Sequence, residues 1–121
     1  MIINVVIISK GEKRIKIYLE KMGLKYEYQF AFLDCCNIKP LPFDFYLPEY
    51  NTCIEYDGIQ HFEPTRFNKK MTIEEANDNF VQQKFRDGIK NSYCKNNNIK
   101  LLRIPYTEYD NIEKIINKYL S

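Results

Sequence analysis

The chain has 121 residues, enough for one domain that folds without disulfides or a structural metal. Hydrophobic residues make up 45% of it and charged residues 28%, which excludes a fibrous or disordered protein. The formal charge of +2 is too small to indicate a nucleic-acid partner by itself. Acidic residues gathered at one site would, however, leave the remaining surface more basic than this sum suggests.

Four cysteines are present without a CxxC pair, and Cys35 and Cys36 are adjacent. This spacing argues against a zinc finger or a disulfide framework and favours a reduced, intracellular setting. The apolar segment 1–8 is about half as long as a membrane span, so we expect an N-terminal strand or docking segment and no membrane partner. Lys, Asn, Ile and Tyr are abundant, and their A/T-rich codons indicate an AT-rich genome such as that of a phage or a low-GC bacterium. The expected location is therefore the cytoplasm of a bacterial or phage-infected cell.

The first half of the chain predicts one helix and three strands. Ser9 and Glu12 match a capping box at the start of a helix over residues 9–22. Alternating aromatic and polar residues predict a strand over 25–33, and residues 33–42 are expected to form a loop. The β-prone runs 43–47 and 52–57, joined by "PEYN", predict an antiparallel hairpin.

The second half predicts two helices around a buried strand. Thr72 and Glu75 again match a capping box, here for a helix over 73–97. "IKLLRIP", residues 99–105, reads as a buried strand, and residues 107–120 as a final amphipathic helix. The order α-β-β-β-α-β-α, without repeats or low-complexity linkers, predicts a single α/β (α+β) domain over residues 1–121.

Acidic residues gather in "FDFYLPEYNTCIEYDGIQH", residues 43–61, which ends on the only histidine of the chain. If the hairpin turns symmetrically, Leu47 pairs with Thr52 and Asp44 faces Glu55 across the ladder. Alternation then places these carboxylates on one face. We expect three apolar residues of the first strand to share its other side: Phe43, Phe45 and Leu47.

Directly opposed like charges destabilise a sheet by roughly 0.2 to 1 kcal/mol, so something must offset the repulsion between Asp44 and Glu55. A divalent cation would do so, because Mg²⁺ is commonly held by one or two carboxylates together with waters and substrate phosphates. The alternative is a half-exposed hairpin whose polar face is acidic and well solvated. The spacing alone leaves both interpretations open.

Two further residues have a functional and a structural interpretation. A turn at Gly58 is expected to bring Gln60 and His61 near the end of the acidic strand, where a neutral imidazole could deprotonate a water held close to the metal. His61 could equally be an ordinary surface or packing residue. Glu12 is either the partner of the Ser9 cap or an acid of the metal site.

The basic candidates lie toward the end of the chain. Lys84, Asp87 and Lys90 are three residues apart, so they could share a helix face directed at the site or form a solvated charged face. Lys100 and Arg103 are candidates for contacts with phosphates. No helix-turn-helix, zinc finger or long basic arm is discernible, so specificity would come from a partner protein, a homodimer or a detached targeting domain.

Three features follow one another in this order: an acid in the first helix, "FDFYLPEYNTCIEYDGIQH" and "KFRDGIKNSYCKNNNIKLLRIPY". With these features the chain resembles the nuclease domains related to very-short-patch-repair endonucleases. These domains belong to the PD-(D/E)xK restriction-endonuclease-like superfamily and include phage homing endonucleases with an acid, acid, histidine, acid signature. The similarity covers nearly the whole chain from Ser9. It implies a restriction-endonuclease-like core, with a mixed central sheet flanked by helices.

The resemblance also implies an activity and its ligands. Asp44 would be the central metal ligand and Glu55 the second acid, with Tyr56 contributing its backbone carbonyl. The expected cofactor is Mg²⁺ or Mn²⁺, and the expected partner is DNA. The implied reaction is hydrolysis of phosphodiester bonds.

Other positions both follow and depart from the superfamily pattern. Glu12 and Asp87 would be outer acids, and His61 the general base. Where the superfamily lysine would follow Glu55, this chain has Asp57. The base and electrostatic roles then pass to the remaining candidates, His61, Lys84 and Lys90.

Three functions therefore compete at this point. The first is a metal-dependent DNA endonuclease or nickase of homing, repair or defence type. The second is a catalytically silent nucleic-acid-binding module with the same fold, which the presence of Asp57 favours. The third is a protein-interaction domain with an acidic groove.

Overall fold

The computed structural model describes residues 8–121, so the segment expected to form an N-terminal strand or docking segment lies, apart from Ile8, outside the described residues. The chain has a mixed α/β fold whose elements follow the expected order α-β-β-β-α-β-α. Two short 3₁₀ turns, η1 and η2, interrupt this order. The elements are α1 (Lys10–Lys21), β1 (Glu27–Asn37), β2 (Lys39–Leu47), β3 (Thr52–Asp57), η1 (Ile59–His61), α2 (Ile73–Asn96), β4 (Lys100–Pro105), η2 (Tyr106–Asn111) and α3 (Ile112–Leu120).

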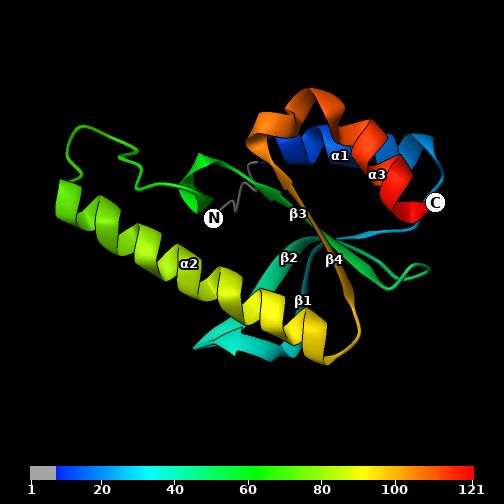
Figure 1. Cartoon of the computed structure of the whole chain (residues 1–121), viewed down its shortest axis with the longest axis horizontal. Coiled ribbons are helices and arrows are strands. Elements are labelled where there is room, and N and C mark those ends of the chain that lie inside the picture. Colours follow the sequence, from blue (N-terminus) through cyan, green and yellow to red (C-terminus); the bar gives the residue numbers. More distant parts are fainter. Residues whose placement is uncertain (1–7) are drawn as a thin grey trace, which may run out of the picture.

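The four strands form one mixed sheet in the order β1-β2-β3-β4. Neighbouring strands are antiparallel from β1 to β3, whereas β3 and β4 run parallel. The connection between β3 and β4 contains α2, as a parallel pair requires a long crossover. Helix α2 covers one face of the sheet, and α1 and α3 lie together on the other (Figure 1).

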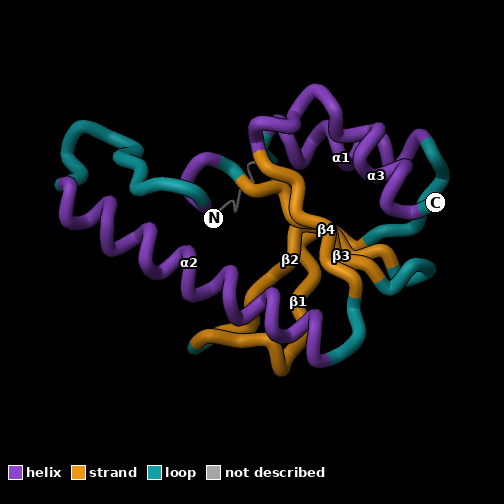
Figure 2. Tube along the Cα trace, in the orientation of Figure 1, coloured by secondary structure: helices purple, strands orange, loops and turns teal. Residues whose placement is uncertain are grey.

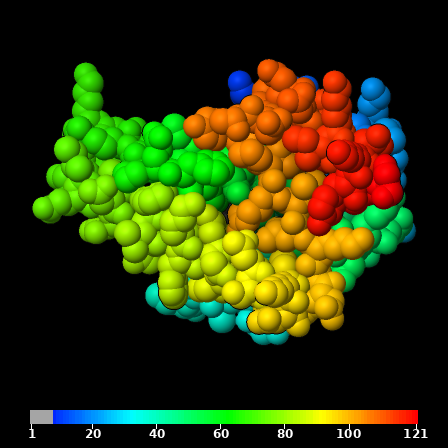
Figure 3. All heavy atoms as spheres, in the orientation of Figure 1, coloured from blue at the N-terminus to red at the C-terminus, as the bar shows by residue number. Residues whose placement is uncertain are grey.

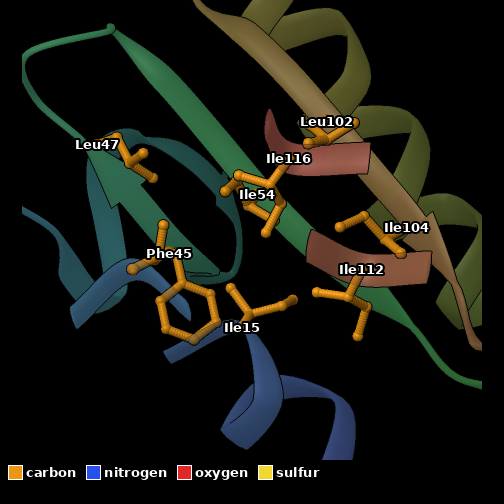
Figure 4. Close-up of a cluster of buried hydrophobic side chains, with 9 residues drawn as sticks. Ile15, Phe45, Leu47, Ile54, Leu102, Ile104, Ile112 and Ile116 are labelled. Atoms are coloured by element: carbon orange, nitrogen blue, oxygen red, sulfur yellow. The ribbon is translucent and has the colours of Figure 1, made fainter. Parts of the chain in front are cut away.

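The larger apolar core fills the space between the sheet and the pair α1 and α3. Figure 4 shows Phe45, Ile54 and Ile104 of the sheet pointing toward Ile15 of α1 and Ile112 of α3. All five side chains are fully buried. Burial of side chains of this size typically contributes about 1.5 to 3 kcal/mol each, so this cluster fixes the two helices on the sheet.

A smaller cluster lies under α2 and corrects one expectation from the sequence. Phe43 packs there with Cys35, Cys53 and Cys94, not on the face occupied by Phe45 and Leu47. Regular alternation fails because the ladder between β2 and β3 ends at the pair Phe45 and Ile54. Beyond this pair β2 no longer follows the β3 ladder, and its Phe43 side chain packs on the α2 side.

The predicted loop over residues 33–42 is also wrong. β1 continues to Asn37 and β2 begins at Lys39, with a tight turn at Ile38, whose φ is 66°. The pairing register shifts between Ala31 and Cys36, which shows a bulge in β1. The prolines of residues 39–42 suggested a loop, but this part of β2 pairs with β1 alone and so tolerates residues that lack an N–H group.

The last predicted helix begins later than expected. Residues 106–111 form the 3₁₀ turn η2, with a kink at Glu108, where φ is −102° and ψ is 19°. Helix α3 starts only at Ile112. The apolar periodicity that indicated a helix comes from Ile112 and Ile116, which are buried in α3. Residues 106–111 bury no side chain, so tertiary packing contributes little free energy that would favour a regular α-helix there.

Helix α2 begins with the predicted capping box, since Thr72 Oγ1 accepts from the Glu75 N–H and the Glu75 carboxylate accepts from the Thr72 N–H. The helix has 24 residues, about 36 Å in length, and its N-terminal half extends past the sheet (Figures 1 and 2). The segment connecting η1 to α2 runs back along this half. Together they form the projecting lobe at the left of Figure 3, called the arm below, which comprises residues 62–82.

Phe45→Ala should lower the free energy of unfolding by about 3 to 5 kcal/mol, because it leaves a cavity in the core between the sheet and α1. Phe85→Ala is the matched control, since the Phe85 ring on α2 is 57% exposed and its loss should change stability by less than about 1 kcal/mol. Urea denaturation followed by circular dichroism measures both. Equal losses in the two variants would contradict the core described here.

Candidate active site

The candidate site begins where β2 and β3 separate. Leu47 pairs with Thr52 as predicted, but the ladder ends at Phe45 and Ile54, so Asp44 and Glu55 lie just beyond it and are not a ladder pair. The two residues do not simply face each other, because each carboxylate accepts a backbone hydrogen bond from the other strand. The Asp44 N–H donates to Glu55 Oε1 at 2.8 Å, and the Tyr56 N–H donates to Asp44 Oδ2 at 2.7 Å.

This reciprocal capping holds the two like charges together in a poorly solvated place. Glu55 is 3% exposed and Asp44 is half-buried. Burial, together with the charges of Glu55 and Glu12, raises the pKa of Asp44 to about 8. Burial also raises the pKa of Glu55, although Lys90 opposes this shift. The site therefore favours occupation by positive charge, either a proton or a cation.

Each acid of β3 has a basic partner from another element. Lys90 of α2 places Nζ 3.1 Å from Glu55 Oε2, and its side chain is 11% exposed. Arg103 of β4 donates from Nη1 to both carboxylate oxygens of Asp57, at 2.9 and 3.2 Å. Asp57 is thus neutralised by an arginine of the neighbouring strand.

His61 lies beside these acids, as the turn after Gly58 predicted. Its Nδ1 is 3.0 and 3.1 Å from the two carboxylate oxygens of Asp87 and 3.6 Å from Asp57 Oδ1. Burial alone would raise the pKa of Asp87, but its hydrogen bonds with His61 and Gln83 lower it below the ordinary value. An ionised Asp87 that accepts from Nδ1–H leaves the lone pair of the imidazole on Nε2, the arrangement of an oriented general base.

One cavity of about 270 Å³ brings most of the predicted residues together. Glu12 reaches it from α1, and its side chain accepts from the Tyr28 hydroxyl at 2.6 Å. The Ser9 cap is present, since Ser9 Oγ accepts from the Glu12 N–H. Gly11 lets α1 approach, because a side chain there would collide with the Tyr56 ring. The predicted residues that line the cavity are Glu12, Asp44, Glu55, Tyr56, Gln60, His61 and Lys90.

Asp57 and Asp87 do not line the cavity but contact Arg103 and His61, and the other predicted residues lie elsewhere. Lys84 lies over the rings of Phe62 and Phe80. Lys100 pairs with Thr52 at the opposite end of β3 from Asp57. Arg103 is engaged within the protein by Asp57, by Asn91 and by the carbonyl of Asp87, so the interactions it makes are those of a positioning residue.

Two polar residues that sequence reasoning missed also line the cavity, Gln83 and Arg86. Gln83 Nε2 donates to Asp87 Oδ1 at 3.0 Å, and Arg86 Nη2 donates to Gln83 Oε1 at 3.3 Å. The signal in the sequence is the spacing of four between Gln83 and Asp87 on α2, which places them on one helix face.

Asp44 and Glu55 are the cavity residues that could supply carboxylate oxygens to a hard cation such as Mg²⁺ or Mn²⁺, together with waters and substrate oxygens. Three of their four oxygens already accept hydrogen bonds, from the N–H groups of Asp44 and Tyr56 and from Lys90. Within residues 8–121, no group of three or more His, Cys, Asp or Glu side chains is placed to hold a metal ion.

Comparison with known proteins finds a viral relative. No family model matches the chain. Over 79 residues it is 35% identical to "Uncharacterized protein 307L" of Invertebrate iridescent virus 6, a match that covers 64% of this chain and 37% of the viral protein. The match thus spans little more than a third of that relative. Among residues 8–121, no helix combines the length and the apolar character that crossing a bilayer requires.

The raised pKa of Asp44 predicts how stability depends on pH in EDTA. The folded protein binds a proton at Asp44 up to about pH 8, whereas the unfolded chain releases it near the ordinary value of 3.8. The folded state therefore holds more protons between these values, and wild-type stability should fall as pH rises from 5 to 8. Asp44→Asn should show a shallower slope and melt at or above the wild-type temperature at pH 8, because one of two like charges is gone.

Thermal melts from pH 5 to 8 measure this difference. Asp78→Asn is the control, because Asp78 is exposed on α2, outside the cavity, and the variant should keep the wild-type slope. Identical slopes in wild type and Asp44→Asn would contradict a proton held at this carboxylate.

Proposed function

We propose that the chain is a metal-dependent DNA endonuclease or nickase, of homing, repair or defence type. The observation that carries the proposal is the convergence of Asp44, Glu55 and His61 at one cavity, with Asp87 bound to His61 behind it. Two carboxylates for a cation and an oriented imidazole are the groups that phosphodiester hydrolysis requires. The resemblance to nuclease domains related to very-short-patch-repair endonucleases supports the same activity.

In this proposal each residue has a stated role. Asp44 and Glu55, with the backbone carbonyl of Tyr56, would hold Mg²⁺ or Mn²⁺. The ion would supply Lewis-acid stabilisation of the negative charge that develops during phosphodiester hydrolysis. His61 accepts a proton from the attacking water at Nε2, and Asp87 fixes the imidazole through Nδ1–H. Lys90 limits the negative charge at Glu55, so that a phosphate can approach.

The distribution of charge supports a DNA partner. Glu12, Asp44, Glu55, Asp57 and Asp87, five of the 16 acidic residues, lie at the site or directly beneath it. Most of the 18 basic residues lie elsewhere, so the outer surface is more basic than the formal charge of +2 indicates. A basic surface around an acidic, metal-binding centre favours association with a phosphate backbone.

A second candidate is a catalytically silent nucleic-acid-binding module. The contact between Lys90 and Glu55 favours it, because the ammonium group occupies one carboxylate oxygen that a metal would need. Plasmid nicking with Mg²⁺ or Mn²⁺ separates the two candidates. A protein-interaction domain remains the third, and retention of DNA in EDTA would exclude it.

Metal binding at the carboxylates predicts a stabilisation that depends on Asp44. At a metal concentration 100 times the dissociation constant, wild type should gain about 2.7 kcal/mol, because the ion binds the folded state preferentially. Asp44→Asn should gain little and cut no DNA, whereas Asp78→Asn should behave as wild type. Thermal melts with and without Mg²⁺ or Mn²⁺, together with plasmid nicking, give both readouts. An equal gain in all three proteins would place the ion elsewhere.

His61→Ala should keep the metal-dependent stabilisation but reduce the cleavage rate by about 10² to 10⁴-fold, the usual contribution of a general base. The fold should survive, because Asp87 retains its bond with Gln83. Asp87→Asn should retain some cleavage and change its pH profile, since the imidazole loses only its orienting charge. Cleavage rates at several pH values test this, and near-normal turnover of His61→Ala would remove His61 from the mechanism.

A further inference from the structure

A second cavity adjoins the candidate active site. It has a volume of about 280 Å³ and lies between the N-terminal half of α2 and the segment after η1. Gln60, Gln83 and Arg86 line both cavities, so these three side chains form the border between them. The second cavity therefore lies directly beside the carboxylates.

The lining of this second cavity combines amide groups with aromatic rings. Asn79 and Gln82 project from α2, and Phe80 and Phe67 contribute rings from α2 and from the preceding segment. Phe67 is 64% exposed. Amide side chains form paired hydrogen bonds with the edges of bases, and aromatic rings stack on base faces.

We propose that this cavity binds one unpaired nucleotide of the DNA strand that is cut at the neighbouring carboxylates, an inference that rests on the function proposed above. The volume suits a single nucleotide and is far too small for a base-paired duplex. Lys84 stands beside the cavity, with Nζ 5.5 Å from the centre of the Phe80 ring, where it can meet the phosphate of that nucleotide. The preferred substrate is thus DNA with an unpaired nucleotide beside the scissile bond.

The second cavity is connected to His61 through hydrogen bonds. Arg86 donates to Gln83, Gln83 donates to Asp87, and Asp87 accepts from His61. A nucleotide that accepts a hydrogen bond from Arg86 would compete with Gln83 for that donor, at the far end of this series of hydrogen bonds from His61. Occupation of the cavity and orientation of the imidazole are therefore coupled through three side chains of α2.

Fluorescence anisotropy in EDTA tests the inference without cleavage. The probes are a fluorescein-labelled DNA duplex and the same duplex carrying one unpaired thymidine. Wild type should bind the second probe about tenfold more tightly, as expected for one stacked base. Phe67→Ala and Gln82→Ala should lose this preference and keep the affinity for the plain duplex.

The matched controls are Phe85→Ala and Asn77→Ala, which remove an exposed ring and an exposed amide of α2 outside this cavity. Both should keep the wild-type preference. Equal binding of the two probes by wild type, or a preference retained in both Phe67→Ala and Gln82→Ala, would overturn the inference.

Plasmid nicking with Mg²⁺, measured in parallel, distinguishes this inference from the proposed function. Cleavage without a preference for the unpaired nucleotide overturns the inference and leaves the nuclease proposal standing. A preference without cleavage overturns the nuclease proposal and supports a nucleotide-binding cavity. Absence of both binding and cleavage overturns both.

Discussion

Two backbone N–H groups would lack partners at the point where β2 leaves β3, and the carboxylates of Asp44 and Glu55 accept them. A buried N–H without a partner costs about 1 to 3 kcal/mol, so each acid stabilises the strand opposite to it. This gain in free energy offsets the repulsion between the two acids. The same hydrogen bonds hold each carboxylate against the backbone of the opposite strand. These two hydrogen bonds therefore hold Asp44 and Glu55 at the wall of the cavity, where Lys90 can pair with Glu55.

The interactions around the two acids show how a small sheet can hold several buried charges. Lys90 on α2 neutralises Glu55, and Arg103 on β4 neutralises Asp57. Within the described residues, every fully buried side-chain nitrogen or oxygen atom has a hydrogen-bond partner. The presence of a buried ion pair is weak evidence that it stabilises the fold. Breaking such a pair is costly, however, because it leaves an uncompensated buried charge. The ion pair between Lys90 and Glu55 therefore resists displacement of α2 from the sheet.

Much of this arrangement was predictable from local patterns. Capping residues located the starts of α1 and α2, and the hairpin register, which pairs Leu47 with Thr52, placed Asp44 and Glu55 just beyond the end of the ladder. The orientation of Phe43 was not predictable, since it depends on where β3 stops pairing. Gln83 and Arg86 were missed because the second cavity exists only once α2 and the segment after η1 are placed side by side.

Lys90 also connects the charge of the cavity to the position of a helix. Its ammonium group reaches Glu55 from α2, 35 residues further along the chain. A charge supplied by a helix moves with that helix, whereas the carboxylate of Glu55 stays with the sheet. A small sliding of α2 along the sheet would therefore change the balance of charge at Glu55 while both strands keep their places.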